Sequence, residues 1–174
     1  IAHNTGVIKG VTTYRDGTML SVLAAVNTQG QEVTLKKITE LPERPSVLPC
    51  DIHQLIVKKE EWVVLVGIKD NEPYEVFCFK KRSFGFNKKT TKGTLTKVKS
   101  GVYKLECDGF ILENVNDFFE RPEEEALTRQ ITLNLKLGAG LGIVVDQLNK
   151  AAGTIVAFSK AIARTLKKYM SEED

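Results

Sequence analysis

The hydrophobic pattern of this 174-residue chain changes its period once, near Asn116. Before that point, from Ile52 onward, short runs rich in Val, Ile, Phe and Tyr alternate with polar turns, as in β-strands. After it, apolar residues recur every three to four positions, which is typical of amphipathic helices. The sequence therefore predicts an α+β fold, with an antiparallel sheet followed by three C-terminal helices that pack on one of its faces.

Six strands are expected from the β-rich runs. They cover His53–Val57, Trp62–Ile68, Tyr74–Phe79, Thr94–Lys99, Val102–Glu106 and Phe110–Asn114. Polar or glycine-containing turns separate most of them, at Lys58–Glu61, Lys69–Pro73, Ser100–Gly101 and Asp108–Gly109. The second run contains Val63–Val66 without a polar residue, which predicts a strand covered on both faces.

The first of the three expected helices has clear start and stop signals. Pro122 suits the first helical position, and the carboxylates of Glu123–Glu125 complement the positive end of a helix. Leu127, Ile131 and Leu135 then recur every four residues and define its apolar face. Gly138 is expected to end it.

Two further helices follow. Apolar residues from Leu141 to Leu148 mark the second, which Gly153 is expected to close. Apolar residues between Ile155 and Tyr169 mark the third. Its basic residues fall mostly on the other side and are interpreted as a solvated face (Lys160, Arg164, Lys167 and Lys168). The glycine-rich Gly138–Gly142 lies between two helices and lacks a preceding strand, so a helix connection is favoured over a phosphate-binding loop.

Composition limits the class of protein. A chain of 174 residues, 42% of them hydrophobic, can bury one sizeable core or a core with a small appendage. The formal net charge of +3 makes no strong case for nucleic acid or membrane, and no apolar run reaches the roughly 18 residues of a membrane span. Three cysteines without a C-x-x-C pair indicate neither a disulfide framework nor a zinc ribbon, so a cytoplasmic location is expected.

The two prolines of Leu41–Pro45 favour extended backbone, and a domain boundary is expected near them. An ordinary surface loop would carry the same prolines. Nearer the N-terminus, Val11, Thr12, Thr13 and Tyr14 form a β-rich run that ends in the turn residues Arg15, Asp16 and Gly17.

This N-terminal phrase, KGVTTYRDGT, resembles the final barrel strand of ribonucleotide reductase large subunits, and most closely that of the adenosylcobalamin-dependent class. Five later phrases are similar, in the same order, to segments of the domain that follows the barrel in that class, often called the TSCPD domain. They are RPSVLPCDIHQL (44–55), WVVLVGIKDNEPYEVF (62–77), LTRQITLNLKLG (127–138), IVVDQLNK (143–150) and FSKAIARTLKKY (158–169).

The resemblance implies four parts: the last strand and turn of a catalytic barrel (1–20), a linker (21–45), a TSCPD-like α+β domain (46–170) and an acidic tail (171–174). It also implies that the chain starts where a catalytic domain ends. The partner would be the catalytic N-terminal portion of the reductase, which would bind the nucleotide substrate and adenosylcobalamin. No cofactor or metal is expected on this chain alone, no membrane partner is expected, and nucleic acid is not favoured.

Two departures from the family pattern matter. Long members continue into a tail with C-x-x-C pairs, whereas this sequence ends at Ser171–Asp174. The redox cysteines, the radical cysteine, its asparagine and glutamate neighbours and the phosphate loop all precede the barrel strand in the family. No catalytic residue is therefore assigned to this chain.

One feature of the strand bears on the class of reductase. Reductases that import a radical from a second subunit carry two adjacent tyrosines at the places of Thr12 and Thr13. Because threonine cannot relay a radical, the resemblance favours a locally generated one and hence the cobalamin type. Tyr14 stands next to these positions.

Cys50, Asp51 and His53 could be taken for a corner of a metal site, but so few ligands do not make one. A strand with a partly buried thiol is the favoured interpretation. Cys78 and Cys107 are likewise expected to be buried structural thiols rather than redox groups.

Residues 80–104 contain nine basic residues and no acid, with Phe84, Phe86 and Tyr103 among them. Basic strands with interleaved aromatic rings are typical of single-strand binders. The favoured alternative is a solvated loop and hairpin whose rings face the core. The possible contact surface comprises Lys80, Lys81, Arg82, Lys88, Lys89 and Lys92.

Two hypotheses follow from the sequence. In the first, the chain is the C-terminal part of a cobalamin-dependent ribonucleotide reductase and has a structural role in it. In the second, it is a non-catalytic regulatory module whose basic segment binds nucleic acid or an acidic partner.

Overall fold

A computed structural model describes residues 24–26, 32–34, 38–81 and 86–170. The chain divides into two compact units, Ile1–Thr39 and Glu40–Asp174. In the first unit, β1 (Ala24–Val26) and β2 (Glu32–Thr34) pair antiparallel. Both lie inside the segment expected to be a linker, and the predicted domain boundaries stay a prediction.

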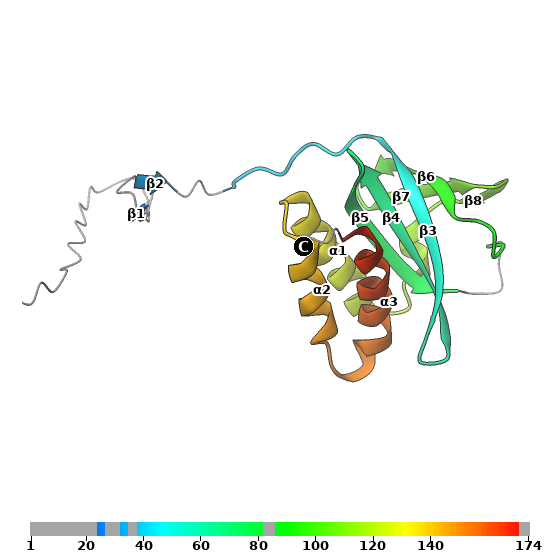
Figure 1. Ribbon diagram of the computed structural model, residues 1–174. Coiled ribbons are helices and arrows are strands. Elements are labelled where there is room, and N and C mark those ends of the chain that lie inside the picture. Colours follow the sequence, from blue (N-terminus) through cyan, green and yellow to red (C-terminus); the bar gives the residue numbers. More distant parts are fainter. Residues whose placement is uncertain (1–23, 27–31, 35–37, 82–85, 171–174) are drawn as a thin grey trace, which may run out of the picture. The chain divides into compact units, whose positions relative to one another are not determined.

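The second unit is an α+β domain built on one six-stranded antiparallel sheet (Figure 1). Its strand order is β5-β4-β3-β6-β7-β8. The strands are β3 (Val47–Val57), β4 (Glu60–Lys69), β5 (Glu72–Lys80), β6 (Lys92–Lys99), β7 (Val102–Cys107) and β8 (Phe110–Leu112). All six strands expected from the sequence are present, and the predicted fold class is confirmed.

β3, the first of the six predicted strands, begins earlier than the sequence predicts, at Val47 rather than His53. Leu48, Cys50 and Ile52 are all buried, so the period-2 pattern extends back across Pro49. At Pro49 the strand pairs only with β6, since its pairing with β4 begins at Cys50. A proline can be accommodated there because one side of the strand has no ladder to break.

The first two hairpin turns are tighter than expected. Lys58 and Lys59 alone form the β3–β4 turn, with φ of 51° and 68°. Asp70 and Asn71 form the β4–β5 turn in the same left-handed region, with φ of 54° and 66°. Positive φ at both central residues defines a two-residue turn that matches the twist of the strands. The remaining residues of the two predicted turns therefore belong to the strands.

Three helices cover one face of β3, β4 and β5 (Figure 1). They are α1 (Pro122–Lys136), α2 (Leu141–Asn149) and α3 (Val156–Leu166), with 3-10 turns at η1 (Val115–Phe118), η2 (Gly153–Ile155) and η3 (Lys167–Tyr169). Pro122 opens α1, and Gly138 follows it with φ of 77°, as predicted. The second helix ends at Asn149, earlier than predicted, and Gly153 instead starts η2.

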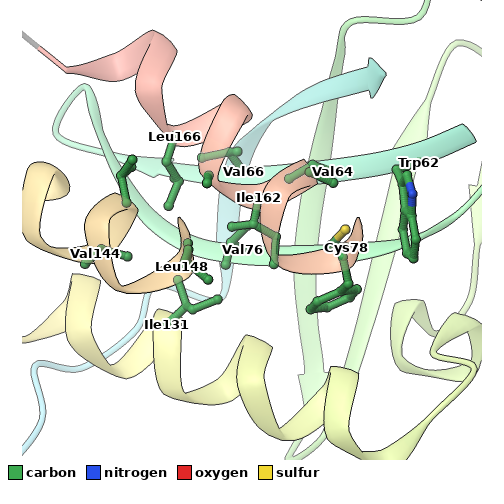
Figure 2. Close-up of a cluster of buried hydrophobic side chains, with 14 of the residues drawn as sticks. Trp62, Val64, Val66, Val76, Cys78, Ile131, Val144, Leu148, Ile162 and Leu166 are labelled. Carbon is green, nitrogen blue, oxygen red and sulfur yellow. The ribbon is translucent and has the colours of Figure 1, made fainter. Parts of the chain in front are cut away.

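The alternation of side chains along the strands produces two apolar clusters. One lies between the sheet and the helices, where Val64, Val66 and Val76 meet Ile131, Ile162 and Leu166 (Figure 2). The other lies on the opposite face of the sheet and draws on all six strands. Residues Val63–Val66 are fully buried, which confirms the prediction of a strand covered on both faces. Each large apolar side chain buried in this way contributes about 1.5–3 kcal/mol.

The second cluster exists because the sheet curls on itself. Phe77 of β5 and Tyr103 of β7 stand four strand positions apart, which would be roughly 19 Å in a flat sheet. Their ring centroids are only 5.0 Å apart. The curl therefore brings the β5 edge close to the β6–β7 hairpin.

Candidate functional site

The strand and turn predicted at Val11–Tyr14 and Arg15–Gly17 lie outside the described residues. Their assignment to a reductase barrel stays a prediction. Within the described residues, no helix combines the length and apolar character needed to cross a bilayer.

Three of the six basic residues named as a possible contact surface pair with carboxylates. Lys80 Nζ lies 2.7 Å from Glu60 and 3.3 Å from Glu120. Lys81 lies 3.8 Å from Glu61, and Lys92 lies 2.5 Å from Asp51. These pairs neutralise half of the predicted surface.

Two of the other three basic residues are exposed. Lys88 and Lys89 are exposed and have no carboxylate partner in the part of the chain that the structure describes, while Arg82 lies outside that part. Of the aromatic rings in this segment, Phe86 is buried and Tyr103 packs against the second cluster. Both rings are directed inward, as the favoured alternative predicts.

The three cysteines are buried free thiols. Burial was expected for Cys78 and Cys107, whereas Cys50, which was expected to be partly buried, is only 1% exposed. Burial raises the pKa of Cys50, Cys78 and Cys107 and so disfavours the reactive thiolate. Cys50 points into the second cluster, whereas Asp51, the next residue along β3, faces the helix side. Among the described residues, no group of three or more His, Cys, Asp or Glu side chains is placed to hold a metal ion.

A hydrogen-bonded network joins β3 to the C-terminal end of the helical layer. The Tyr169 hydroxyl donates to Asp51 Oδ2 at 2.8 Å, and His53 Nε2 lies 2.6 Å from the same hydroxyl oxygen. Lys92 pairs with the other oxygen of Asp51. Lys168 Nζ lies 3.4 Å from His53 Nδ1.

These contacts indicate which nitrogen of the His53 imidazole carries the hydrogen. Because Tyr169 uses its single hydrogen on Asp51, His53 Nε2 must donate to the hydroxyl oxygen. Nδ1 of the neutral ring is then the acceptor for Lys168. Burial, together with the positive charge of Lys168, lowers the pKa of His53 and favours this neutral form.

The same network shifts the pKa values of its oxygen acids. Burial and then the hydrogen bond to Asp51 raise the pKa of Tyr169, so its hydroxyl stays protonated. Burial opposes ionisation of Asp51, but hydrogen bonds from Lys92 and Tyr169 outweigh it and lower that pKa. The network thus fixes η3 against β3. Nothing in the sequence signals it, because Asp51 and Tyr169 are far apart along the chain.

A second polar feature is a buried ion pair at the start of the domain. Arg44 Nε donates to Glu75 Oε2 at 2.8 Å and Nη2 to Oε1 at 2.5 Å, and the side chains are only 4% and 1% exposed. Such a bidentate pair is geometrically specific. Gly67 on the neighbouring strand makes room for it, because a Cβ there would lie 2.6 Å from Glu75 Cγ.

A cavity of about 380 Å³ lies beside this pair. It is bounded by β5, the β6–β7 turn, η1 and α1. Among its lining residues are Glu75, Phe77, Tyr103, Phe119, Arg129 and Lys136. Its size falls within the range of small-molecule sites in proteins. No sequence signal marks this site, because Glu75 lies within a strand pattern and Lys136 within a helix pattern.

Most of the second unit matches a known domain family. A family described as the NrdJ homologue C-terminal domain matches residues 48–171, nearly the whole of the second unit. The chain therefore belongs to this family, which is related to the class II ribonucleotide reductase NrdJ. No curated protein and no solved structure shows significant similarity to the chain.

Proposed function

We propose that this chain is the C-terminal portion of an adenosylcobalamin-dependent ribonucleotide reductase, the enzyme that reduces ribonucleotides to deoxyribonucleotides for DNA synthesis. The family match over residues 48–171 carries the proposal. The KGVTTYRDGT phrase supports it. This phrase resembles the last barrel strand, and in this chain it precedes the domain that matches the family. The second unit would correspond to the TSCPD-type domain.

In this proposal the chain acts structurally. Residues 11–14 would complete the catalytic barrel of the preceding portion, and the α+β domain would pack after it. The radical-bearing cysteine, the redox cysteines and the substrate phosphates would all be held by that portion.

Adenosylcobalamin would also be held there. It would supply the radical that starts the reaction. In the described part of the chain, the cavity beside α1 holds only about 380 Å³, far less than a corrin ring with its two nucleoside groups requires. No residue that lines this cavity is therefore assigned to the cofactor, and no step of the reaction is assigned to the described residues.

Reconstitution tests the proposal. The reading frame that carries the catalytic cysteines, upstream of or beside this coding sequence, is expressed as a separate polypeptide and mixed with this chain. We expect a stable complex and a reduction of ribonucleoside di- or triphosphates that needs adenosylcobalamin and increases at least tenfold when this chain is added.

Two deletions sharpen the experiment. Removing residues 1–20 is expected to abolish both the complex and the gain in activity, because the barrel strand is lost. Removing residues 171–174 is the matched control and is expected to change neither. The absence of any such reading frame, or equal activity with and without the chain, would contradict the proposal and favour a free-standing binding module.

A further inference from the structure

The cavity beside α1 is lined by one buried carboxylate, whose charge is already neutralised. Glu75 is the buried carboxylate that faces it, and both of its oxygens are engaged by Arg44. A buried carboxylate without such a partner would be strongly destabilising. Since the pair is complete, this carboxylate neither needs nor attracts a further cation.

The lining also contains a cation that has no ion-pair partner among the described residues. Lys136, in the last turn of α1, is half-buried, and its ammonium lies 5.2 Å from the centre of the Tyr74 ring. No carboxylate pairs with it among the described residues. The other cation of the lining, Arg129, is held 2.5 Å from Glu125 on the same helix.

The electrostatics of Lys136 agree with this geometry. Burial lowers its pKa; the attraction of Glu75 opposes that shift, while the positive charges of Arg44 and Lys97 add to it. An anion in the cavity would stabilise the ammonium form.

The lining of the cavity is also aromatic. Phe77 and Tyr103 are tilted against each other with their centroids 5.0 Å apart, and Phe119 adds a third ring. The Arg44 guanidinium lies over the Tyr103 ring, 5.4 Å from its centre, so a ligand would contact the part of the ring that Arg44 leaves uncovered. Rings of this kind bind planar groups through stacking and edge contacts. A small inorganic anion would leave this surface unfilled, and a neutral aromatic molecule would leave Lys136 without a counter-charge.

We propose that this cavity binds a small organic anion built on a planar ring, with its carboxylate or phosphate against Lys136 Nζ and its ring against Phe77 and Tyr103. This binding is independent of the proposed role in a reductase. It requires only the folded domain, in which all of these residues lie.

Titrations of the full chain followed by ¹H–¹⁵N NMR test the proposal with four probes. 2-Naphthoate carries a ring and a carboxylate, and phenyl phosphate carries a ring and a phosphate. 2-Naphthylmethanol lacks the charge, and acetate lacks the ring. We expect saturable shifts at Tyr103, Thr132 and Lys136 with at least one ring-bearing anion, and binding at least tenfold weaker for 2-naphthylmethanol and acetate. The anion that binds more tightly distinguishes a carboxylate from a phosphate ligand.

The chain offers a matched pair of variants. Lys69 also lies over the Tyr74 ring, at 5.1 Å, but does not line the cavity. Lys136→Gln is expected to weaken binding of the anion at least tenfold, and Lys136→Arg to retain it. Lys69→Gln is expected to change it less than twofold.

Three outcomes would overturn the proposal. They are no saturable binding of either ring-bearing anion up to 10 mM, equal binding of the uncharged probe, and equal losses from Lys136→Gln and Lys69→Gln. The spectra of the free variants show whether each is folded, so loss of binding is distinguished from loss of structure.

Discussion

At the scale of single residues, the His53–Tyr169–Asp51 network shows how one neutral imidazole can join two elements that are far apart in the sequence, β3 and η3. His53 donates through Nε2 to Tyr169 and accepts through Nδ1 from Lys168, so both ring nitrogens are used in the neutral state. Protonation would turn Nδ1 into a donor facing an ammonium group. The contact with Lys168 is therefore compatible only with neutral histidine.

This arrangement predicts a pH dependence of stability. In the unfolded chain His53 takes up a proton near pH 6.5, whereas in the folded domain its pKa is lowered. As the pH falls below about 6.5, the unfolded state binds more protons, so the free energy of unfolding decreases. Urea unfolding between pH 8 and pH 5 measures this loss. The range stays above the region in which Asp51, whose pKa is also lowered, titrates.

The two histidines of the chain provide the control. His53→Gln keeps a donor and an acceptor but cannot titrate, so it is expected to flatten the pH dependence. His3→Gln is expected to leave it unchanged. An unchanged slope in His53→Gln would show that another group is responsible.

At the scale of elements, α1 protects an edge of the sheet. β5 is the outermost strand on its side, and an uncovered edge is a template for unwanted pairing. Thr132 of α1 provides hydrogen bonds for backbone groups at this edge. The Val76 N–H donates to the Thr132 hydroxyl at 3.1 Å, and the hydroxyl donates to the Val76 carbonyl at 3.4 Å. The helix thus takes the place of a neighbouring strand.

Removing this hydroxyl should destabilise the domain. Thr132→Val keeps the shape of the side chain but leaves the Val76 amide buried without a partner, which costs about 1–3 kcal/mol. Thr128→Val is the matched control on the same helix. The Thr128 hydroxyl bonds only to the Glu124 carbonyl, which remains bonded within the helix, so a loss below about 0.5 kcal/mol is expected. Equal losses in urea unfolding would refute the role of Thr132.

At the scale of the whole molecule, both apolar clusters are built from the second unit. Their buried residues begin at Cys50 in one cluster and Val57 in the other, and the buried ion pair begins at Arg44. Among the described residues, every member of both clusters belongs to the second unit.

A fragment of residues 40–174 is therefore expected to fold alone. Its urea midpoint and m-value should equal those of the full chain, because the m-value follows the surface exposed on unfolding, and its extrapolated free energy of unfolding should agree within the 10–15% error of extrapolation. The full chain under identical conditions is the control. A clearly lower midpoint for the fragment would show that the first unit contributes to the stability of the second.

The local elements of this protein could be predicted from the sequence alone. Strands, helices and most turn positions follow from hydrophobic period, proline and glycine, which act over a few neighbouring residues. Where these signals conflict, as at Pro49, the observed start of β3 differs from the predicted one. The pairing of the strand decides whether the proline is tolerated.

The polar sites could not be predicted, because they depend on the packing of distant segments. Arg44 pairs with Glu75, Tyr169 bonds to Asp51, and Lys136 lines the same cavity as Phe77 and Tyr103. Each of these arrangements depends on the curl of the sheet or on where a helix docks. Both are set by the packing of the two apolar clusters as wholes, and no short stretch of sequence contains that information.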